Sequence, residues 1–154
     1  MARITVSTTI EASPAEVWAA VEDVASHVEW MADAEAIRFT SAATSGVGTT
    51  FECDTKVGPL RLTDLMEITR WDPGKAMGVR HVGLVTGEGT FTLSPAGGRR
   101  LRRRRATRFE WSERLVFPWW MGGPVGGIVG GRIMRLIWKR NLRRLKEIVE
   151  DAGR

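Results

Sequence analysis

The chain has 154 residues, enough for one domain built around one hydrophobic core. Hydrophobic residues make up 43% and charged residues 27%, as in an ordinary globular protein. The single cysteine, Cys53, excludes an intramolecular disulfide and a cysteine-based metal site. The absence of tyrosine excludes a phenolic acid or base. The net charge of +5 depends on six arginines within residues 99–105, and the rest of the chain is close to neutral.

The first 31 residues are predicted to form a strand and two helices. Residues 3–11 alternate and are rich in β-branched side chains, which is typical of a strand. A helix is expected to follow, because Ser13 can cap it, Pro14 suits the first helical position and Glu16 completes a capping box. A second short helix is predicted over residues 24–31, and His27 within it is interpreted as a surface or capping residue.

From residue 36 onwards the hydrophobic pattern has a period of two. Short turn signals, most of them rich in glycine or proline, separate the segments and predict antiparallel hairpins in a meander. The predicted strands are residues 36–40, 48–56, 60–71, 76–85, 88–94 and 107–117.

The pattern becomes helical again from Pro124 to near the C-terminus. An amphipathic helix of roughly 28 residues cannot fold alone, so its apolar stripe must pack on the sheet. We therefore predict an α+β fold in which a strongly curved antiparallel sheet of about seven strands wraps around this helix and leaves a space beside it. The stripe consists of Ile128, Val129, Ile133, Leu136, Ile137, Leu142, Leu145, Ile148 and Val149.

Three stretches carry a resemblance to a known family. They are residues 10–18 with 29–31, the turn at residues 69–75, and residues 107–109 with 117–120. On these motifs the chain resembles the START/Bet v 1-like superfamily, also called the SRPBCC or polyketide cyclase/dehydrase family. The resemblance covers essentially the whole chain and implies a helix-grip fold in a single ligand-binding domain over residues 1–154. It implies no catalytic residue, because the family shares none.

Alternation along the strands indicates which side chains face the helix. One face of the last strand is mostly large and apolar, which makes it the inner face: Phe109, Trp111, Glu113, Leu115 and Phe117. Glu113 is therefore expected to point inward. The same alternation gives Asp64 and His81 as inward polar residues on the segments 60–71 and 76–85.

Asp64, His81 and Glu113 have two interpretations. In the first, a Glu–His pair in an apolar cavity holds a ligand hydroxyl or carbonyl, or moves a proton as an acid/base pair. In the second, these residues lie at the cavity mouth or pair with an arginine such as Arg70 or Arg80, because an unpaired buried carboxylate is costly. Cys53 is interpreted as a small buried apolar residue rather than a nucleophile.

The predicted ligand-binding residues come from the inner strand faces, from the segment before the last helix and from that helix. Trp119 and Trp120 either line the entrance or cover the helix start. The full set is Phe51, Cys53, Met66, Met77, Val79, His81, Phe91, Phe109, Trp111, Glu113, Trp119, Trp120, Val129 and Ile133.

Glycine pairs recur every four residues around the start of the last helix, at residues 122–123, 126–127 and 130–131. Each helical glycine costs about 1 kcal/mol relative to alanine, so the glycines are expected to have a use. They can leave space for a cavity, let the helix end move, or allow close packing of helix on sheet.

The arginine run at residues 99–105 has three interpretations: a solvated hairpin tip, a weak contact with an anionic membrane surface, or an attraction for nucleic acid. Nucleic acid is the least expected partner, because the run lacks interleaved aromatics and a groove-reading element. No segment resembles a signal peptide, and the longest apolar stretch, residues 117–131, is shorter than a membrane span. We therefore expect a cytoplasmic protein, and nothing in the sequence indicates its oligomeric state.

We expect the chain to bind a hydrophobic small molecule that is lipid-, polyketide- or isoprenoid-like, as a carrier or binding protein. The alternative is a cyclase or dehydratase acting on a polyketide-like substrate, with His81 and Glu113 as acid/base groups. A third possibility is an interaction module whose cavity is incidental. We expect no metal and no cofactor, because the sequence holds no metal-ligand cluster and no phosphate-cradling glycine motif.

Overall fold

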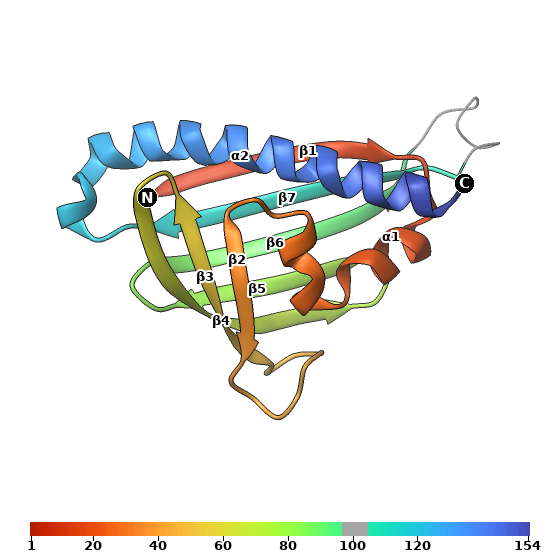
Figure 1. Ribbon diagram of the computed structural model, residues 1–154, viewed down its shortest axis with the longest axis horizontal. Coiled ribbons are helices and arrows are strands. Elements are labelled where there is room, and N and C mark those ends of the chain that lie inside the picture. Colours follow the sequence, from red (N-terminus) through yellow and green to blue (C-terminus); the bar gives the residue numbers. More distant parts are fainter. Residues whose placement is uncertain (97–104) are drawn as a thin grey trace.

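The structure, a computed structural model, describes residues 1–96 and 105–154. Seven strands form one antiparallel sheet, and a long helix lies against one of its faces (Figure 1). The strands are β1 (Ala2–Ile10), β2 (Ala34–Phe39), β3 (Thr50–Val57), β4 (Leu60–Asp72), β5 (Ala76–Val82), β6 (Thr86–Pro95) and β7 (Thr107–Val116). The helices are α1 (Pro14–Val21), the 3-10 helices η1 (Val24–Glu29) and η2 (Trp119–Met121), and α2 (Gly123–Ala152).

The order of strands in the sheet is β1-β7-β6-β5-β4-β3-β2, so the first strand pairs with the last and the others form a meander. The predicted helix-grip arrangement, with two short helices after the first strand, is confirmed. The predicted segment 76–85 is shorter in the structure, because Val82 pairs with Thr86 and residues 83–85 form the turn between them.

The start of α1 follows from its capping residues. The Ser13 hydroxyl accepts a hydrogen bond from the Glu16 backbone N–H, and the Glu16 carboxylate accepts one from the Ser13 backbone N–H at 2.7 Å. This is the predicted capping box, in which each residue satisfies a backbone donor of the other. The second short helix is a 3-10 helix, and the Asp23 side chain caps it by accepting from the Ala25 N–H.

A β-bulge in β4, between Ile68 and Arg70, changes which side chains face inward. Before the bulge the even-numbered residues face the helix, and after it Trp71 does. Trp71 then packs edge-to-face on Trp18 of α1, with ring centroids 5.2 Å apart. The bulge therefore lets one strand serve both the cavity and the contact with α1.

Helix α2 buries its side chains mainly in its C-terminal half. Its buried side chains are Trp138, Asn141, Leu142, Leu145 and Val149. The prediction that the whole stripe faces the sheet is wrong for its first half, because Ile128, Val129, Ile133 and Leu136 are exposed.

Helix geometry explains this difference. Ile133 and Leu136 lie nine residues before Leu142 and Leu145, and nine residues are two and a half turns. The two pairs therefore point to opposite sides of the helix, and one straight helix cannot bury both against one sheet. No helix within the described residues is both long and apolar enough to cross a membrane.

No α2 glycine lines the cavity between the sheet and α2, but Gly127 and Gly131 line a second, more open hollow between α2 and the start of β1. A Cβ on Gly126 would lie 2.3 Å from the Met121 carbonyl oxygen, so this glycine allows close packing at the helix start. A Cβ on Gly127 or Gly130 would meet nothing within 4 Å. Of the predicted arginine run, residues 99–104 lie outside the described residues, and Arg105 is exposed.

A cavity between the sheet and the C-terminal helix

A cavity of about 90 Å³ lies between the inner face of the sheet, the η1–β2 segment and α2. Nine of the predicted ligand-binding residues line it: Phe51, Cys53, Met66, Met77, Val79, His81, Phe91, Trp111 and Glu113. Asp64 also lines it. The period-two pattern of the strands thus brings these side chains to one wall.

The other five predicted residues lie elsewhere. Phe109 is fully buried in the core, and the remaining four, Trp119, Trp120, Val129 and Ile133, are exposed. Phe109 packs on Phe91 with ring centroids 5.2 Å apart, so it contacts a residue of the cavity wall from the neighbouring strand β7. The four exposed residues belong to η2 and to the side of α2 that faces away from the sheet.

The polar side chains Asp64, His81 and Glu113 come together in the cavity wall. His81 Nδ1 lies 3.8 Å from Asp64 Oδ2, and His81 Nε2 lies 3.5 Å from Glu113 Oε2. All three side chains are buried. The arginines considered as partners lie elsewhere, since Arg80 pairs with Glu67 and Arg70 with Asp72.

This cluster is only partly hydrogen-bonded. Glu113 Oε1 accepts a hydrogen bond from Trp111 Nε1 at 2.9 Å. Both His81 nitrogens and Asp64 Oδ1 are buried without a hydrogen-bond partner among the described residues. Buried polar groups are normally satisfied, so these atoms have capacity to bind a polar group that enters the cavity.

The two carboxylates control the charge of His81. Burial alone would lower its pKa, but the nearby Asp64 and Glu113 carboxylates outweigh burial and raise the pKa to about 10. At neutral pH, His81 is therefore an imidazolium between two acids. It can donate hydrogen bonds or a proton, whereas a carboxylate of the cluster can accept one.

Gly89 of β6 makes room for the Glu113 side chain. The two residues pair across the sheet, and a Cβ on Gly89 would lie 2.8 Å from Glu113 Oε1. β6 separates β5 from β7, so a side chain at Gly89 would occupy the position of the Glu113 carboxylate beside His81. The sequence analysis did not identify this residue; its signal is a glycine inside a strand, which often marks a close approach.

His27, expected at the surface or as a cap, is buried and lines the cavity, so the expected surface position is wrong, although its ring does bond the carbonyl of the last residue of α1. Its Nε2 donates to the Val21 carbonyl oxygen at 2.7 Å, which satisfies one ring nitrogen inside the protein. Burial lowers the pKa of His27 to about 4 despite this hydrogen bond, so the ring is neutral at pH 7. In the sequence it resembles a surface residue because the polar residues Asp23 and Ser26 lie close to it.

A polar contact that the sequence analysis missed fixes α2 across the cavity. Asn141 Nδ2 donates to Asp33 Oδ1 at 2.7 Å, and the Ala32 backbone N–H donates to Asn141 Oδ1 at 3.0 Å. Trp138 Nε1 lies 3.4 Å from Asp33 Oδ2. Asn141 interrupts the apolar stripe, and this interruption was the available signal.

The remaining walls are aromatic and flexible. Trp111 stacks on Trp138 of α2 with ring centroids 4.3 Å apart, so the sheet and helix meet through two indoles. Four of the six methionines of the chain line the cavity: Met31, Met66, Met77 and Met134. Methionine is unbranched and fills irregular gaps, so this wall can rearrange at low cost.

Cys53 lines the cavity as a thiol. Burial raises its pKa to about 11, which keeps the sulfur protonated and unreactive at neutral pH. Among the residues that the structure describes, no three histidine, cysteine, aspartate or glutamate side chains are placed to hold a metal ion. The side chains that line the cavity offer apolar contact, hydrogen bonding and proton transfer.

The family model described as "Polyketide cyclase / dehydrase and lipid transport" matches residues 1–150. Among solved structures, the chain is similar to TTHA0849 from Thermus thermophilus, with a TM-score of 0.74, 19% identity and 99% of each chain covered. It is also similar to XoxI from Bacillus cereus, with a TM-score of 0.75, 16% identity, and 100% of this chain and 99% of the other covered. At these identities the likeness shows the fold alone. No curated protein matches the chain.

Proposed function

Because the chain belongs to the polyketide cyclase / dehydrase and lipid transport family, we propose that it binds a lipid-, polyketide- or isoprenoid-like molecule in this cavity, as a carrier or binding protein. The observation that carries the proposal is the partly open, mostly apolar space between sheet and helix, with polar atoms gathered at Asp64, His81 and Glu113. Such a combination suits a ligand with an oily body and one polar group.

The size of the cavity places a condition on this proposal. Its volume of about 90 Å³ is smaller than the roughly 150 Å³ of an apolar cavity that binds benzene, and smaller than ordinary ligand pockets of roughly 300–1,000 Å³. A lipid-sized ligand must therefore displace side chains. The four methionines in the wall support this, because they can change rotamer without breaking a hydrogen bond.

The polar cluster supports recognition of a hydroxyl or carbonyl group. The His81 imidazolium has two N–H donors, and both lie beyond hydrogen-bond distance from the neighbouring carboxylates, at 3.5 and 3.8 Å. A ligand oxygen that came within hydrogen-bond distance of either N–H from the cavity side would gain a charge-assisted hydrogen bond. A ligand hydroxyl could at the same time donate to Asp64 Oδ1, which has no partner among the described residues.

The first test uses the neutral apolar dye N-phenyl-1-naphthylamine, whose fluorescence rises in apolar surroundings. Val79→Phe fills the cavity from β5, and we expect it to weaken dye binding by about tenfold or more, which corresponds to about 1.4 kcal/mol. Val47→Phe is the matched control, because it makes the same substitution at an exposed loop position. Cys53→Leu fills the same space from β3 and serves if Val79→Phe does not fold.

Native mass spectrometry of protein purified without detergent gives the chemical class of a co-purifying ligand. Equal dye affinity in Val79→Phe, Cys53→Leu and the parent protein would contradict the proposal, provided that circular dichroism shows the variants folded. So would the loss of dye binding in Val47→Phe alone.

A second candidate function is a cyclase or dehydratase, and the observation that favours it is the imidazolium of His81 beside the Glu113 carboxylate. In such an enzyme His81 would act as the general acid and Glu113 as the general base. Glu113→Gln separates the two functions. A carrier variant keeps its affinity for the co-purifying ligand within a few-fold, whereas an enzyme variant loses turnover and retains bound product.

A further inference from the structure

Large apolar side chains gather on the surface around the start of α2. Within residues 119–136 seven are exposed, and the most exposed are Trp119 at 85%, Val125 at 71% and Leu136 at 70%. We call this set the α2 patch: Trp119, Trp120, Val125, Ile128, Val129, Ile133 and Leu136. Single exposed apolar residues are ordinary, but a contiguous group marks an interaction surface.

The helix places its apolar residues outward in this region. Gly127 and Gly131 occupy the side turned toward the protein, where Gly131 approaches Ala2 of β1. The aliphatic residues Ile133 and Leu136 occupy the opposite side, two and a half turns out of phase with the buried Leu142 and Leu145. Ile133 and Leu136 are therefore not a core face that is left uncovered, because the sheet is on the other side of the helix; Ile128 lies at the edge of the patch, where it lines the hollow beside β1.

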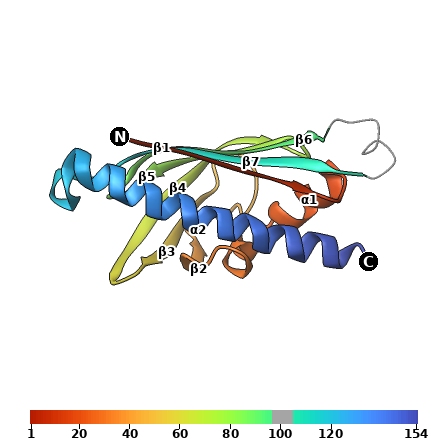
Figure 2. The same cartoon turned by 90° about the horizontal axis from the view of Figure 1, so that it is seen from above.

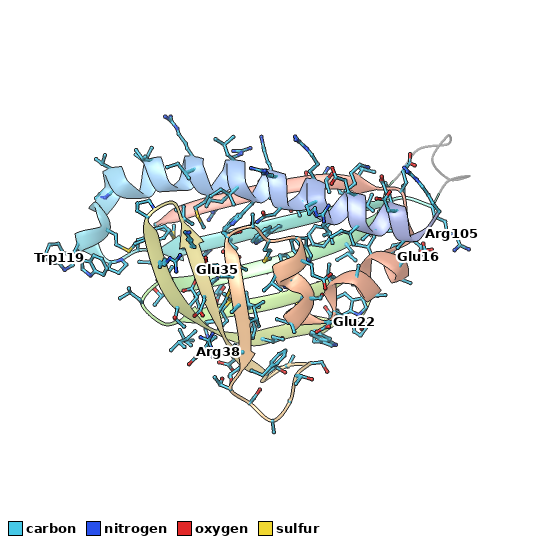
Figure 3. The ribbon with its side chains drawn as sticks, in the orientation of Figure 1. Glu16, Glu22, Glu35, Arg38, Arg105 and Trp119 are labelled. Carbon is cyan, nitrogen blue, oxygen red and sulfur yellow. The ribbon has the colours of Figure 1, made fainter. Side chains whose placement is uncertain are left out.

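The ends of the elements put the patch at one tip of the molecule. η2 and the first turns of α2 extend beyond the sheet in both views (Figures 1 and 2). Trp119 lies at this tip and points away from the body, while Arg105 lies at the opposite end (Figure 3). Trp119 is thus far from Arg105, the one described residue of the arginine run that the sequence analysis associated with membranes.

The charges around the patch are all of one sign. Residues 114–146 contain eight arginines and lysines and no acidic residue. Five of the basic residues, Arg132, Arg135, Lys139, Arg140 and Arg143, are exposed on α2, and none forms a salt bridge with another described residue. Charge complementarity therefore favours a negatively charged partner for this surface and disfavours a second copy of the same basic surface.

We propose that the α2 patch and its basic residues dock the protein on an anionic lipid bilayer. Tryptophan is enriched at the interface between lipid tails and headgroups, where Trp119 and Trp120 would insert. The aliphatic residues would lie in the same layer, as in interfacial helices. Arg132 and Arg135 would extend their charged ends to the headgroups, and Lys139, Arg140 and Arg143 would bind phosphates further along the helix.

This inference does not depend on the proposed function, because no residue of the α2 patch lines the cavity. The α2 patch and the cavity are nonetheless connected through α2, whose Met134 and Trp138 form part of the cavity wall next to the patch. Docking would bring that wall close to the membrane. A bound lipid-like ligand would then have a short route between the bilayer and the cavity.

The test is co-sedimentation with vesicles of phosphatidylcholine alone or mixed with phosphatidylglycerol. We expect binding to the mixed vesicles, weakened by added salt. The pair Lys139→Glu and Arg143→Glu should reduce this binding by at least about tenfold, since each basic residue near an anionic surface contributes to the attraction. Lys56→Glu is the charge control, because Lys56 is exposed on β3.

The apolar part is tested by Trp119→Ser with Trp120→Ser. Brominated phosphatidylcholine in the mixed vesicles should quench part of the tryptophan fluorescence of the parent protein, and this quenching should be lost in the double variant. Val47→Ser, another exposed apolar residue, is the control and should bind as the parent does. Dye binding in the cavity should be unchanged in all these variants, which separates failure of docking from failure of the proposed function.

Three outcomes would overturn the inference. The first is that the parent, the Lys139→Glu/Arg143→Glu variant and the Trp119→Ser/Trp120→Ser variant all bind mixed vesicles equally. The second is a dimer in light scattering that Trp119→Ser with Trp120→Ser dissociates, which would assign the patch to self-association. The third is binding to a DNA duplex that displaces the protein from vesicles, which would assign the basic residues to nucleic acid.

Discussion

The charge of His81 is decided by two residues that are distant in sequence. Asp64 comes from β4 and Glu113 from β7, and each contributes a carboxylate oxygen within 4 Å of the imidazole. Gly89, on the intervening strand β6, allows Glu113 to reach this position. The buried cluster is therefore a product of three strands and one missing side chain, and the charge on His81 is its most direct consequence.

His81 should make stability fall as the pH rises. Its pKa is raised in the folded protein from an ordinary 6.5 to about 10, so its contribution is fully present below pH 6.5 and is lost between pH 6.5 and 10. The free energy of unfolding should fall by up to about 1.4 kcal/mol per pH unit in this range. His81→Gln should remove most of this slope, as measured by urea unfolding from pH 6.5 to 9.

The range from pH 6.5 to 9 separates His81 from two other groups whose pKa values are shifted. The folded-state pKa of His27 is lowered to about 4, so His27 changes stability only below pH 6.5, and the pKa of Cys53 is raised from 9.0 to about 11, so it acts above pH 9. A parent protein with flat stability between pH 6.5 and 9 would contradict the charge assigned to His81.

At the scale of elements, α2 consists of two halves with different roles. The second half carries the buried side chains and the Asn141–Asp33 hydrogen bond, which hold the helix on the sheet. The first half carries the glycines and the exposed patch. Glycine lowers helix stability. Replacing each glycine by alanine therefore shows which positions need the absence of a side chain and which do not.

Gly126 and Gly130 should respond to alanine in opposite directions. Gly130→Ala meets no atom within 4 Å and should raise the free energy of unfolding by up to about 1 kcal/mol through helix propensity. Gly126→Ala places its Cβ against the Met121 carbonyl and should lower the free energy of unfolding by about 1–3 kcal/mol, the usual cost of overpacking. Chemical denaturation measures both, and destabilisation by Gly130→Ala would show that this glycine has another role.

At the scale of the whole molecule, stability should be distributed unevenly along α2. Local opening requires less free energy where few apolar side chains are buried. Backbone amides of residues 126–136 should therefore exchange hydrogen faster than those of residues 139–149, whose neighbours include Leu142, Leu145 and Val149. Hydrogen exchange followed by mass spectrometry compares the two halves within one helix, and equal protection along α2 would contradict this picture.

Local opening of the first half of α2 would widen the cavity. Met134 and Trp138 belong to the turns where the exposed half meets the buried half, and both line the cavity. A space of about 90 Å³ must widen to hold a lipid-like guest. Met134 is thus both a flexible part of the cavity lining and a residue close to the first half of α2.

The sequence by itself determined the order of the elements and most of the inward-facing residues. Strands have a period of two, so the assignment of Asp64, His81 and Glu113 to inner faces needed only the alternation with large apolar neighbours. The start of α1 was equally local, because a capping box is made by residues three apart. The long helix and its amphipathic second half also followed from local periodicity.

Only the tertiary structure decided features that depend on residues far apart in the chain. The distances within the Asp64–His81–Glu113 cluster, the space that Gly89 provides and the link between Asn141 and Asp33 all join different elements. Contacts between distant residues also decided which side of the first half of α2 faces the sheet. A helix can pack only one side on a sheet, and the larger set of contacts, in its second half, fixed which side that was.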